Sequence, residues 1–95
     1  MLDDDHGFEW DFFKEQYNIE KHGVDFKTAM LVFKDPNLVV LMDRAHSIQE
    51  ERFWGMGLAN GHIMTVRFVY RGAKIRILGA GYWRKGAQYY EKKKI

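Results

Sequence analysis

The pattern of polar and apolar positions in the first third of the chain predicts two helices, and the first is marked by the residues at its ends. Asp11 occupies an N-cap position after a short extended segment at Phe8–Trp10, and helix-compatible residues run from there to His22. Gly23 then stands where a helix often ends in a left-handed residue. We therefore expect a first helix between Asp11 and Gly23.

A second helix is predicted directly after the first. Asp25 is its N-cap candidate, and Asp35-Pro36 stops it, because the residue before a proline disfavours the helical region. Between them an apolar stripe recurs at i, i+3, i+4 and i+7, made of Phe26, Ala29, Met30 and Phe33.

The middle of the chain changes to the alternation of β-strands. Asn60-Gly61 lies between two such runs, and this dipeptide is a strong signal for a tight hairpin. Along the run after it, Met64, Val66, Phe68 and Tyr70 share one face while Thr65 and Arg67 lie on the other. Strands are expected over residues 38–42, 52–58, 62–70 and 74–80, and a last helix over 83–93.

These elements predict one α+β domain over residues 1–95. It has two N-terminal helices, an antiparallel sheet of three or four strands with a short N-terminal strand, and a C-terminal helix. The helices are expected to cover one face of the sheet. The other face would stay partly open, and function is expected there.

Composition supports a folded domain with an uneven charge. Hydrophobic residues make up 46% of the chain and cysteine is absent, so the chain can form a core but no disulfide. From Arg67 onward the sequence contains nine lysines and arginines but only one acidic side chain, Glu91. Such a basic half suits RNA or an acidic protein partner, or is a solvated surface without a specific ligand.

Several classes of protein are disfavoured. The acidic N-terminus differs from a secretory leader, and the longest apolar run, residues 38–42, is too short to cross a membrane, so we expect a cytoplasmic protein with no membrane contact. The sequence has no phosphate-binding glycine loop and no Gly-x-Ser-x-Gly elbow. Four scattered histidines give no metal spacing, although His22 and His46 could meet in space, and no metal or cofactor is expected.

Cations and proton-carrying residues gather where helices and strands end. RNA cleavage without a metal requires a base, an acid and a cation that stabilises the phosphorane. The candidates for catalysis are Lys21, His22, Glu51, Arg52 and Arg76, and those for RNA binding are Arg67, Arg84 and Lys85.

Each candidate also has a structural explanation. Lys21 and His22 are favoured at a helix C-terminus by its dipole. Glu51 and Arg52 can form a surface ion pair, whereas Arg76 amid isoleucines needs water, a carboxylate or a ligand. Residues 92–94 suit a solvated tail, and Trp83 and Tyr90 suit the core better than base stacking.

The order of motifs resembles the BrnT toxin family. The resemblance rests on Phe8-Glu9-Trp10-Asp11, residues 18–26, Ala29–Phe33 with Asp35-Pro36, Asp43 and His46 followed by Glu50-Glu51-Arg52-Phe53, and Lys74-Ile75-Arg76-Ile77. It implies a RelE-like ribonuclease fold, RNA cleavage that inhibits translation, and neutralisation by a BrnA-type antitoxin. It also implies that DNA is contacted only through the antitoxin.

One segment departs from the family pattern. Members commonly read Ile-Ser-Ala-Arg after the Arg76 strand, whereas this chain has Leu78-Gly79-Ala80-Gly81. If that arginine binds phosphate, Arg84 or Lys85 must replace it, or activity is reduced.

Three functions follow for comparison. The first is a metal-independent endoribonuclease in which Arg76 and Arg52 hold the phosphate and Lys21, His22 or Glu51 transfers protons. The second is a non-catalytic domain that binds an antitoxin or RNA and acts as a co-repressor. A small structural domain with an unrelated partner is a third alternative.

Overall fold

A computed structural model of the chain describes residues 2–5 and 7–94. Its elements in chain order are β1 (Leu2–Asp5), β2 (Phe8–Asp11), α1 (Phe12–His22), α2 (Phe26–Ala29), the 3-10 helix η1 (Met30–Lys34), β3 (Val39–Met42), the 3-10 helix η2 (Arg44–His46), β4 (Phe53–Ala59), β5 (His62–Arg71), β6 (Lys74–Gly81) and α3 (Arg84–Lys94). Helices and strands occur together, so the predicted α+β class is confirmed. Within the described ranges, no helix is long and apolar enough to cross a membrane.

The strands form one mixed sheet in the order β1-β2-β6-β5-β4-β3. The predicted antiparallel hairpins are present, and Asn60 (φ 53°) and Gly61 (φ 82°) form the turn between β4 and β5. The predicted short N-terminal strand is present as β2, but it joins the sheet in parallel with β6, and β1, which was not predicted, adds an outer strand. The hydrogen bonds between strands join backbone groups, whatever the side chains are. Because β1 has no alternation of apolar and polar residues, the sequence did not predict it as a strand.

Helix α1 begins and ends where the sequence indicates. Asp11 is its N-cap, and Asp11 Oδ1 accepts the N–H groups of Phe13 at 2.8 Å and Lys14 at 3.4 Å. The Phe13 N–H, as the largest cause, holds the pKa of Asp11 below its usual value. Gly23 (φ 71°) ends the helix and donates its N–H to the Ile19 carbonyl at 2.8 Å.

The second helix is shorter than predicted and is capped differently. It is α-helical only from Phe26 to Ala29 and continues as η1. Asp25 stands at the N-cap, but its side chain makes no capping hydrogen bond. Glu15 of α1 accepts the Phe26 N–H at 2.9 Å instead, and its other oxygen accepts the indole N–H of Trp10 at 3.2 Å.

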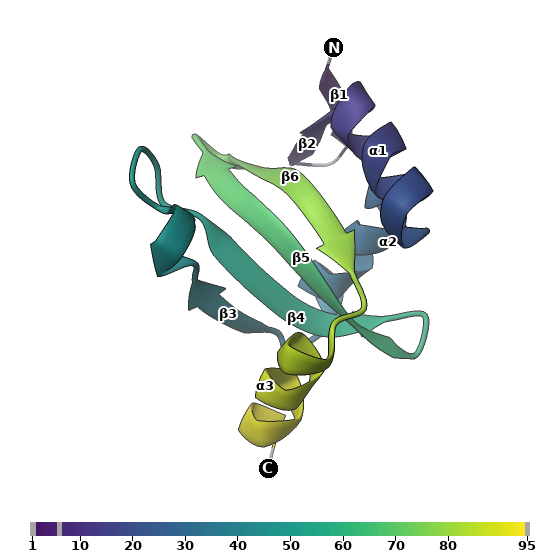
Figure 1. Cartoon of the computed structure of the whole chain (residues 1–95), viewed down its shortest axis with the longest axis vertical. Coiled ribbons are helices and arrows are strands. Elements are labelled where there is room, and N and C mark those ends of the chain that lie inside the picture. Colours follow the sequence, from purple (N-terminus) through teal and green to yellow (C-terminus); the bar gives the residue numbers. More distant parts are fainter. Residues whose placement is uncertain (1, 6, 95) are drawn as a thin grey trace.

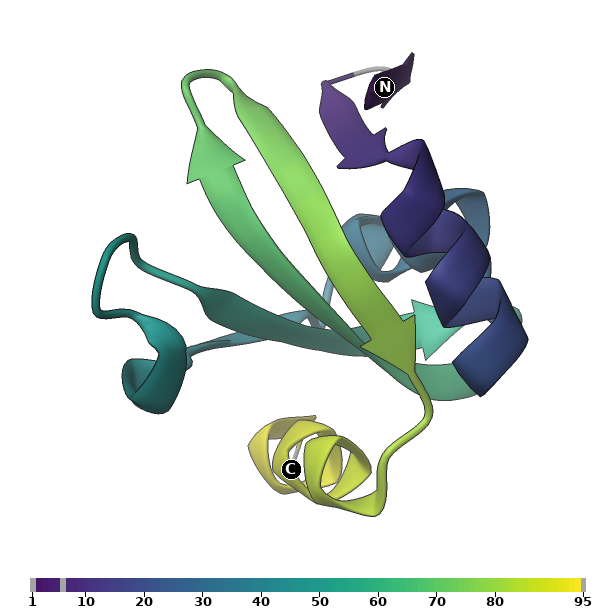
Figure 2. The same cartoon turned by 45° about the horizontal axis from the view of Figure 1, so that its top comes forward.

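Helices cover both faces of the sheet, which corrects the prediction of a single covered face. On one face α2 and η1 pack over β4–β6, where Met64, Val66 and Phe68 are completely buried. On the other face α3 packs on β3–β5, and Tyr90 joins Val39 and Met56 in a second core cluster. Figures 1 and 2 show that the second face stays uncovered between α1 and α3.

Asn18 fixes the position of α1 against the sheet. Its amide nitrogen donates to the carbonyls of Ala80 and Val24, both at 2.9 Å, and its Oδ1 accepts the Ala80 N–H at 3.1 Å. β2 pairs with β6 only as far as Ile77, so the Asn18 amide takes the place of a strand partner beyond it. The side chain is buried, so these bonds do not compete with water.

Tyr90 joins α3 to the loop before β3. Its hydroxyl donates to Asp35 Oδ2 at 2.7 Å, and the same oxygen accepts the Leu58 N–H at 2.8 Å. The hydrogen bond to Asp35, with burial as the second cause, raises the pKa of Tyr90.

Replacing Asn18 should destabilise the whole domain. Asn18→Ala leaves the buried N–H and carbonyl of Ala80 without partners, and we expect a loss of about 3 kcal/mol in the free energy of unfolding. Urea denaturation followed by circular dichroism measures it. Gln16→Ala, on the exposed side of the same helix, is the control and should change stability by less than about 0.5 kcal/mol. Equal stability of the two variants would contradict the role given to Asn18.

The hydrogen bond from the Tyr90 hydroxyl to Asp35 predicts that the stability of the domain depends on pH under alkaline conditions. Tyr90→Phe should cost about 2 kcal/mol at neutral pH, because Asp35 loses a donor. The folded pKa lies above the unfolded value, so this contribution is complete below about pH 10 and declines as pH rises toward the folded pKa. Urea denaturation of both proteins between neutral pH and about pH 11 tests this. A stability difference that grows above pH 10 would contradict it.

Candidate functional site

The uncovered part of the sheet contains two adjoining hollows. The α1 hollow, about 470 Å³, lies between α1 and strands β5 and β6, and its lining includes His22, Arg52, Arg67 and Gly79. The α3 hollow, about 330 Å³, lies between the sheet and the start of α3, and its lining includes Arg67 and Lys85. Arg67 and Trp83 line both hollows. Three of the predicted site residues therefore meet in the α1 hollow.

Arg52 presents a nitrogen without a partner. Its backbone N–H is held by the Ser47 hydroxyl at 2.9 Å, and that hydroxyl donates to the Asp43 carbonyl at 2.6 Å. Its Nε is buried and has no hydrogen-bond partner. A buried guanidinium nitrogen in this state has lost water without gaining a protein acceptor, so an anionic oxygen would be a favourable ligand.

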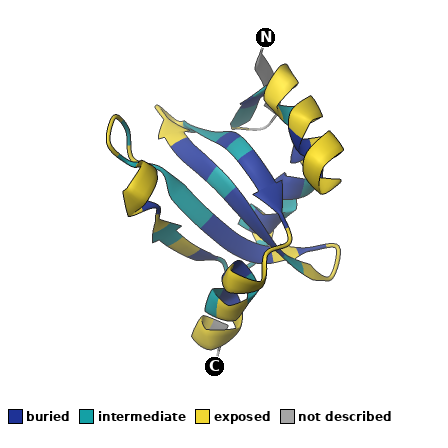
Figure 3. Ribbon diagram, viewed as in Figure 1, coloured by how far each residue is buried: buried dark blue, intermediate teal, exposed yellow. Residues whose placement is uncertain are grey.

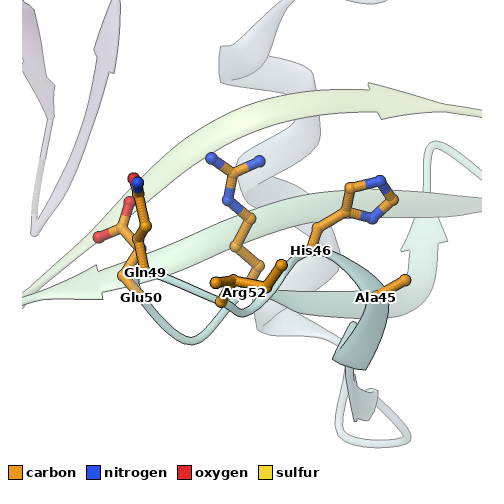
Figure 4. A pocket seen from close by; sticks show the side chains of 6 residues that line it. Ala45, His46, Gln49, Glu50 and Arg52 are labelled. Atoms are coloured by element: carbon orange, nitrogen blue, oxygen red, sulfur yellow. The ribbon is translucent and has the colours of Figure 1, made fainter.

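A third hollow extends the site past Arg52. This loop hollow, about 550 Å³, is lined by Ala45, His46, Ile48, Gln49, Glu50 and Arg52. Figure 4 shows the Arg52 side chain extending toward the sheet, with His46 to one side of it and Glu50 to the other. Arg52 is thus the residue shared by the α1 hollow and the loop hollow.

His46 is held by a buried carboxylate. Its Nδ1 lies 2.9 Å from Asp43 Oδ2 and 3.1 Å from Oδ1, and the indole N–H of Trp54 donates to Oδ2 at 3.1 Å. The Asp43 side chain is 4% exposed and that of His46 is 58% exposed. With Nδ1 directed at Asp43, Nε2 is the nitrogen left to exchange a proton with a ligand.

Glu50, which lines the loop hollow beside Arg52, lies among arginines. Glu50 accepts two bonds from the guanidinium of Arg71, at 3.0 and 3.2 Å. This pairing is the largest cause of the lowered pKa of Glu50, and the charges of Arg52 and Arg76 lower it further. Three arginines therefore act on one carboxylate.

Arg76 is less available than the sequence predicted. It lies beside Glu9 in the parallel β2–β6 register, and its guanidinium pairs with the Glu9 carboxylate at 3.4 Å. The two side chains are 20% and 15% exposed. Arg76 lies outside the linings of the three hollows.

Three other predicted residues also lie outside these linings. Lys21 bonds to the Tyr17 hydroxyl at 3.1 Å and its ammonium lies 5.5 Å from the centre of that ring. Glu51 is exposed in the loop before β4, where Glu50 rather than Glu51 lines a hollow. Arg84 is exposed at the first position of α3.

Gly81 and Gly86 allow close packing beside the α3 hollow. A Cβ at Gly86 would overlap the Thr65 hydroxyl, so α3 sits directly on β5. A Cβ at Gly81 would come within 2.8 Å of the Trp83 indole. The ring of Trp83 therefore rests against the backbone where the resemblance leads one to expect an arginine.

Sequence reasoning found only part of this site. It singled out His22, Arg52 and Arg67, whereas Asp43 and His46 entered only through the family resemblance and, for His46, as a residue that could approach His22. The spacing Asp-x-x-His was the available signal, because one 3-10 turn brings residues i and i+3 together. Within residues 2–5 and 7–94, no three His, Cys, Asp or Glu side chains form a group that could hold a metal ion.

A family model gives the identity of the chain. The model of the ribonuclease toxin BrnT of type II toxin–antitoxin systems matches residues 10–86. This chain belongs to the BrnT toxin family. Membership of a type II system implies a protein antitoxin as its partner. Comparison with curated proteins gave no match.

The BrnT match includes most of the described site. Residues 10–86 contain the Asp43–His46 pair, Arg52, Arg67 and Trp83, and the α1 hollow lies entirely within them. The residues that hold α1 and β6 together, Asn18 and Ala80, are also inside the matched range. The geometry of the site is therefore part of the family domain and not of an added segment.

Proposed function

We propose that this BrnT protein is a metal-independent endoribonuclease with a RelE-like fold. The observation that carries the proposal is Arg52, which lines both the α1 hollow and the loop hollow and has a buried Nε without a hydrogen-bond partner. In the reaction the 2′-hydroxyl of RNA attacks the neighbouring phosphate. The bond to the 5′-oxygen breaks, and a 2′,3′-cyclic phosphate remains on one product.

Arg52 and Arg67 bind the scissile phosphate in this proposal. Both line the α1 hollow, and a planar guanidinium can bond to two phosphate oxygens at once. The charge that develops on the phosphorane strengthens these bonds in the transition state, which lowers the barrier. Arg76 does not contact the phosphate in this proposal, because its guanidinium is already paired with the Glu9 carboxylate.

In this proposal two histidines move the protons. His22 lines the α1 hollow and His46 lines the loop hollow, with Arg52 common to both linings. One histidine takes the proton from the 2′-hydroxyl and the other gives a proton to the departing 5′-oxygen. Asp43 is a positioning residue that fixes the ring of His46. Lys21 and Glu51, the other predicted candidates, lie outside these linings.

In the cell, such cleavage would inhibit translation in the cytoplasm. A BrnA-type antitoxin would neutralise the protein and provide the contact with DNA. The alternative, a non-catalytic domain that binds RNA or antitoxin, rests on the glycines at positions 79 and 81. The experiments below distinguish the two.

Cleavage should survive removal of metal ions and require Arg52. Purified protein incubated with RNA and EDTA should release fragments that end in a 2′,3′-cyclic phosphate, as detected by mass spectrometry. Arg52→Ala and Arg67→Ala should each lower the rate about 100-fold or more, since a transition-state contact is lost. Arg52→Lys keeps the charge and should still lose rate, because the planar fork is gone.

The matched control is Lys27→Ala, which removes an exposed positive charge from α2, on the opposite face of the sheet. It should cleave at the wild-type rate. Intact RNA over a wide range of wild-type protein concentrations would reject the enzyme in favour of the binding domain. Full activity of folded Arg52→Ala, with folding checked by circular dichroism, would reject the site.

The histidine pair predicts a change in the pH profile. Wild-type cleavage should show a bell-shaped dependence on pH, and His46→Ala should remove one side of the bell and lower the rate about 100-fold. Asp43→Asn should lower the rate less, because the ring remains but its orientation is weaker. His62→Ala is the control, since His62 is exposed at the start of β5 outside the three hollows. An unchanged profile for His46→Ala would exclude His46 as a proton carrier.

A further inference from the structure

We propose that Trp83 is a stacking platform for an unpaired nucleobase of the RNA substrate, an inference that rests on the proposed function. The base would lie against the indole between the α1 hollow and the α3 hollow. Its flanking phosphates would contact Arg67 and Lys85. The inference adds a binding subsite for single-stranded RNA to the cleavage site around Arg52.

Trp83 differs from the other two tryptophans of the chain. The indole N–H of Trp10 donates to Glu15 and that of Trp54 donates to Asp43. The indole N–H of Trp83 has no hydrogen-bond partner among the described residues, and 37% of the residue is exposed. A tryptophan that only fills a core usually buries its ring and satisfies its N–H, so packing alone does not explain Trp83.

The ring is nevertheless held in place. Two of its carbon atoms lie 2.8 Å from the position that a Cβ of Gly81 would take. His22 meets it edge-on, with ring centres 5.2 Å apart and planes at 76°. A ring that is fixed before the ligand arrives loses little conformational entropy on binding, so it is suited to stacking.

The charges beside the ring suit a polyanion. Trp83 lines both hollows together with Arg67, while Lys14 lies on the α1 side and Lys85 on the α3 side. Asp11 is the one carboxylate in either lining, and its Oδ1 is occupied by the N–H groups that begin α1. An aromatic face flanked by cations is the arrangement by which proteins bind single-stranded nucleic acid. An acidic peptide would not require the aromatic face, and an apolar peptide would not require the flanking cations.

The size of the hollows is compatible with a nucleotide bound beside the ring. At about 470 and 330 Å³, both fall within the range of roughly 300–1,000 Å³ found for small-molecule sites. Because a paired base cannot leave its neighbours to stack on protein, the subsite selects single-stranded RNA. Selection at this subsite is by shape and stacking, and the described contacts indicate no preference for one base.

Binding of an RNA that cannot be cleaved tests the inference. The probe is a single-stranded 2′-O-methyl oligonucleotide, whose blocked 2′-oxygen prevents the reaction, and fluorescence anisotropy gives the dissociation constant. Trp83→Leu should raise that constant about 10-fold, as expected for the loss of one stacked base. Trp83→Phe should recover most of the affinity. An abasic oligonucleotide with the same number of phosphates should bind wild type and Trp83→Leu equally.

Two further variants separate stacking from folding. Gly81→Ala keeps the tryptophan but displaces its ring, and Gly81 has no positive φ, so the backbone tolerates alanine. It should weaken binding of the probe as Trp83→Leu does. Tyr82→Leu is the matched control, because Tyr82 is 52% exposed and lies outside both linings, and it should bind as the wild type does.

The inference and the proposed function fail in different ways. Cleavage of RNA together with unchanged probe binding by Trp83→Leu and Gly81→Ala would overturn the stacking subsite and leave the ribonuclease. Trp83-dependent binding without cleavage would support the subsite and reject the ribonuclease. Failure of the wild-type protein to bind the probe, with antitoxin binding lost in Trp83→Leu, would assign this surface to a protein partner and overturn the inference.

Discussion

The site depends on the amide of Asn18. Beyond the last residue that β2 pairs, the outer edge of β6 would be left with unpaired backbone groups at Ala80, and Asn18 supplies both a donor and an acceptor there. An unpaired buried polar group is costly, so few other placements of α1 are favourable. Because this contact sets where α1 lies, it also sets the distance from His22 to the arginines on the sheet.

Two other polar side chains, Glu15 and Asp35, fix the positions of the helices. Glu15 joins the start of α2 to α1, and Asp35 joins α3 to β4 through Tyr90 and the Leu58 N–H. Each uses one carboxylate to bind two separate elements. The open face of the sheet is therefore bounded by helices that are tied by directional bonds, and not by apolar packing alone.

The sequence predicted the features that depend on contacts between residues close together in the chain. The limits of α1 follow from Asp11 and Gly23, and the β4–β5 turn follows from Asn60-Gly61. The parallel pairing of β2 with β6 joins segments more than sixty residues apart, and no short-range pattern encodes it. The same is true of the site, since the pairing of Arg76 with Glu9 and the meeting of His22 with Arg52 and Arg67 both depend on the folded sheet. His46 was not among the predicted site residues, because its contact with the buried carboxylate of Asp43 appears only in the folded chain.

The buried Nε of Arg52 links folding to occupancy. In the free protein this nitrogen has left water and found no acceptor, a state that lowers the stability of the empty form. Any anion that satisfies it binds the folded chain and not the unfolded one, and so shifts the folding equilibrium toward the native state. The folded chain would therefore be most stable when an anionic oxygen occupies the site beside Arg52.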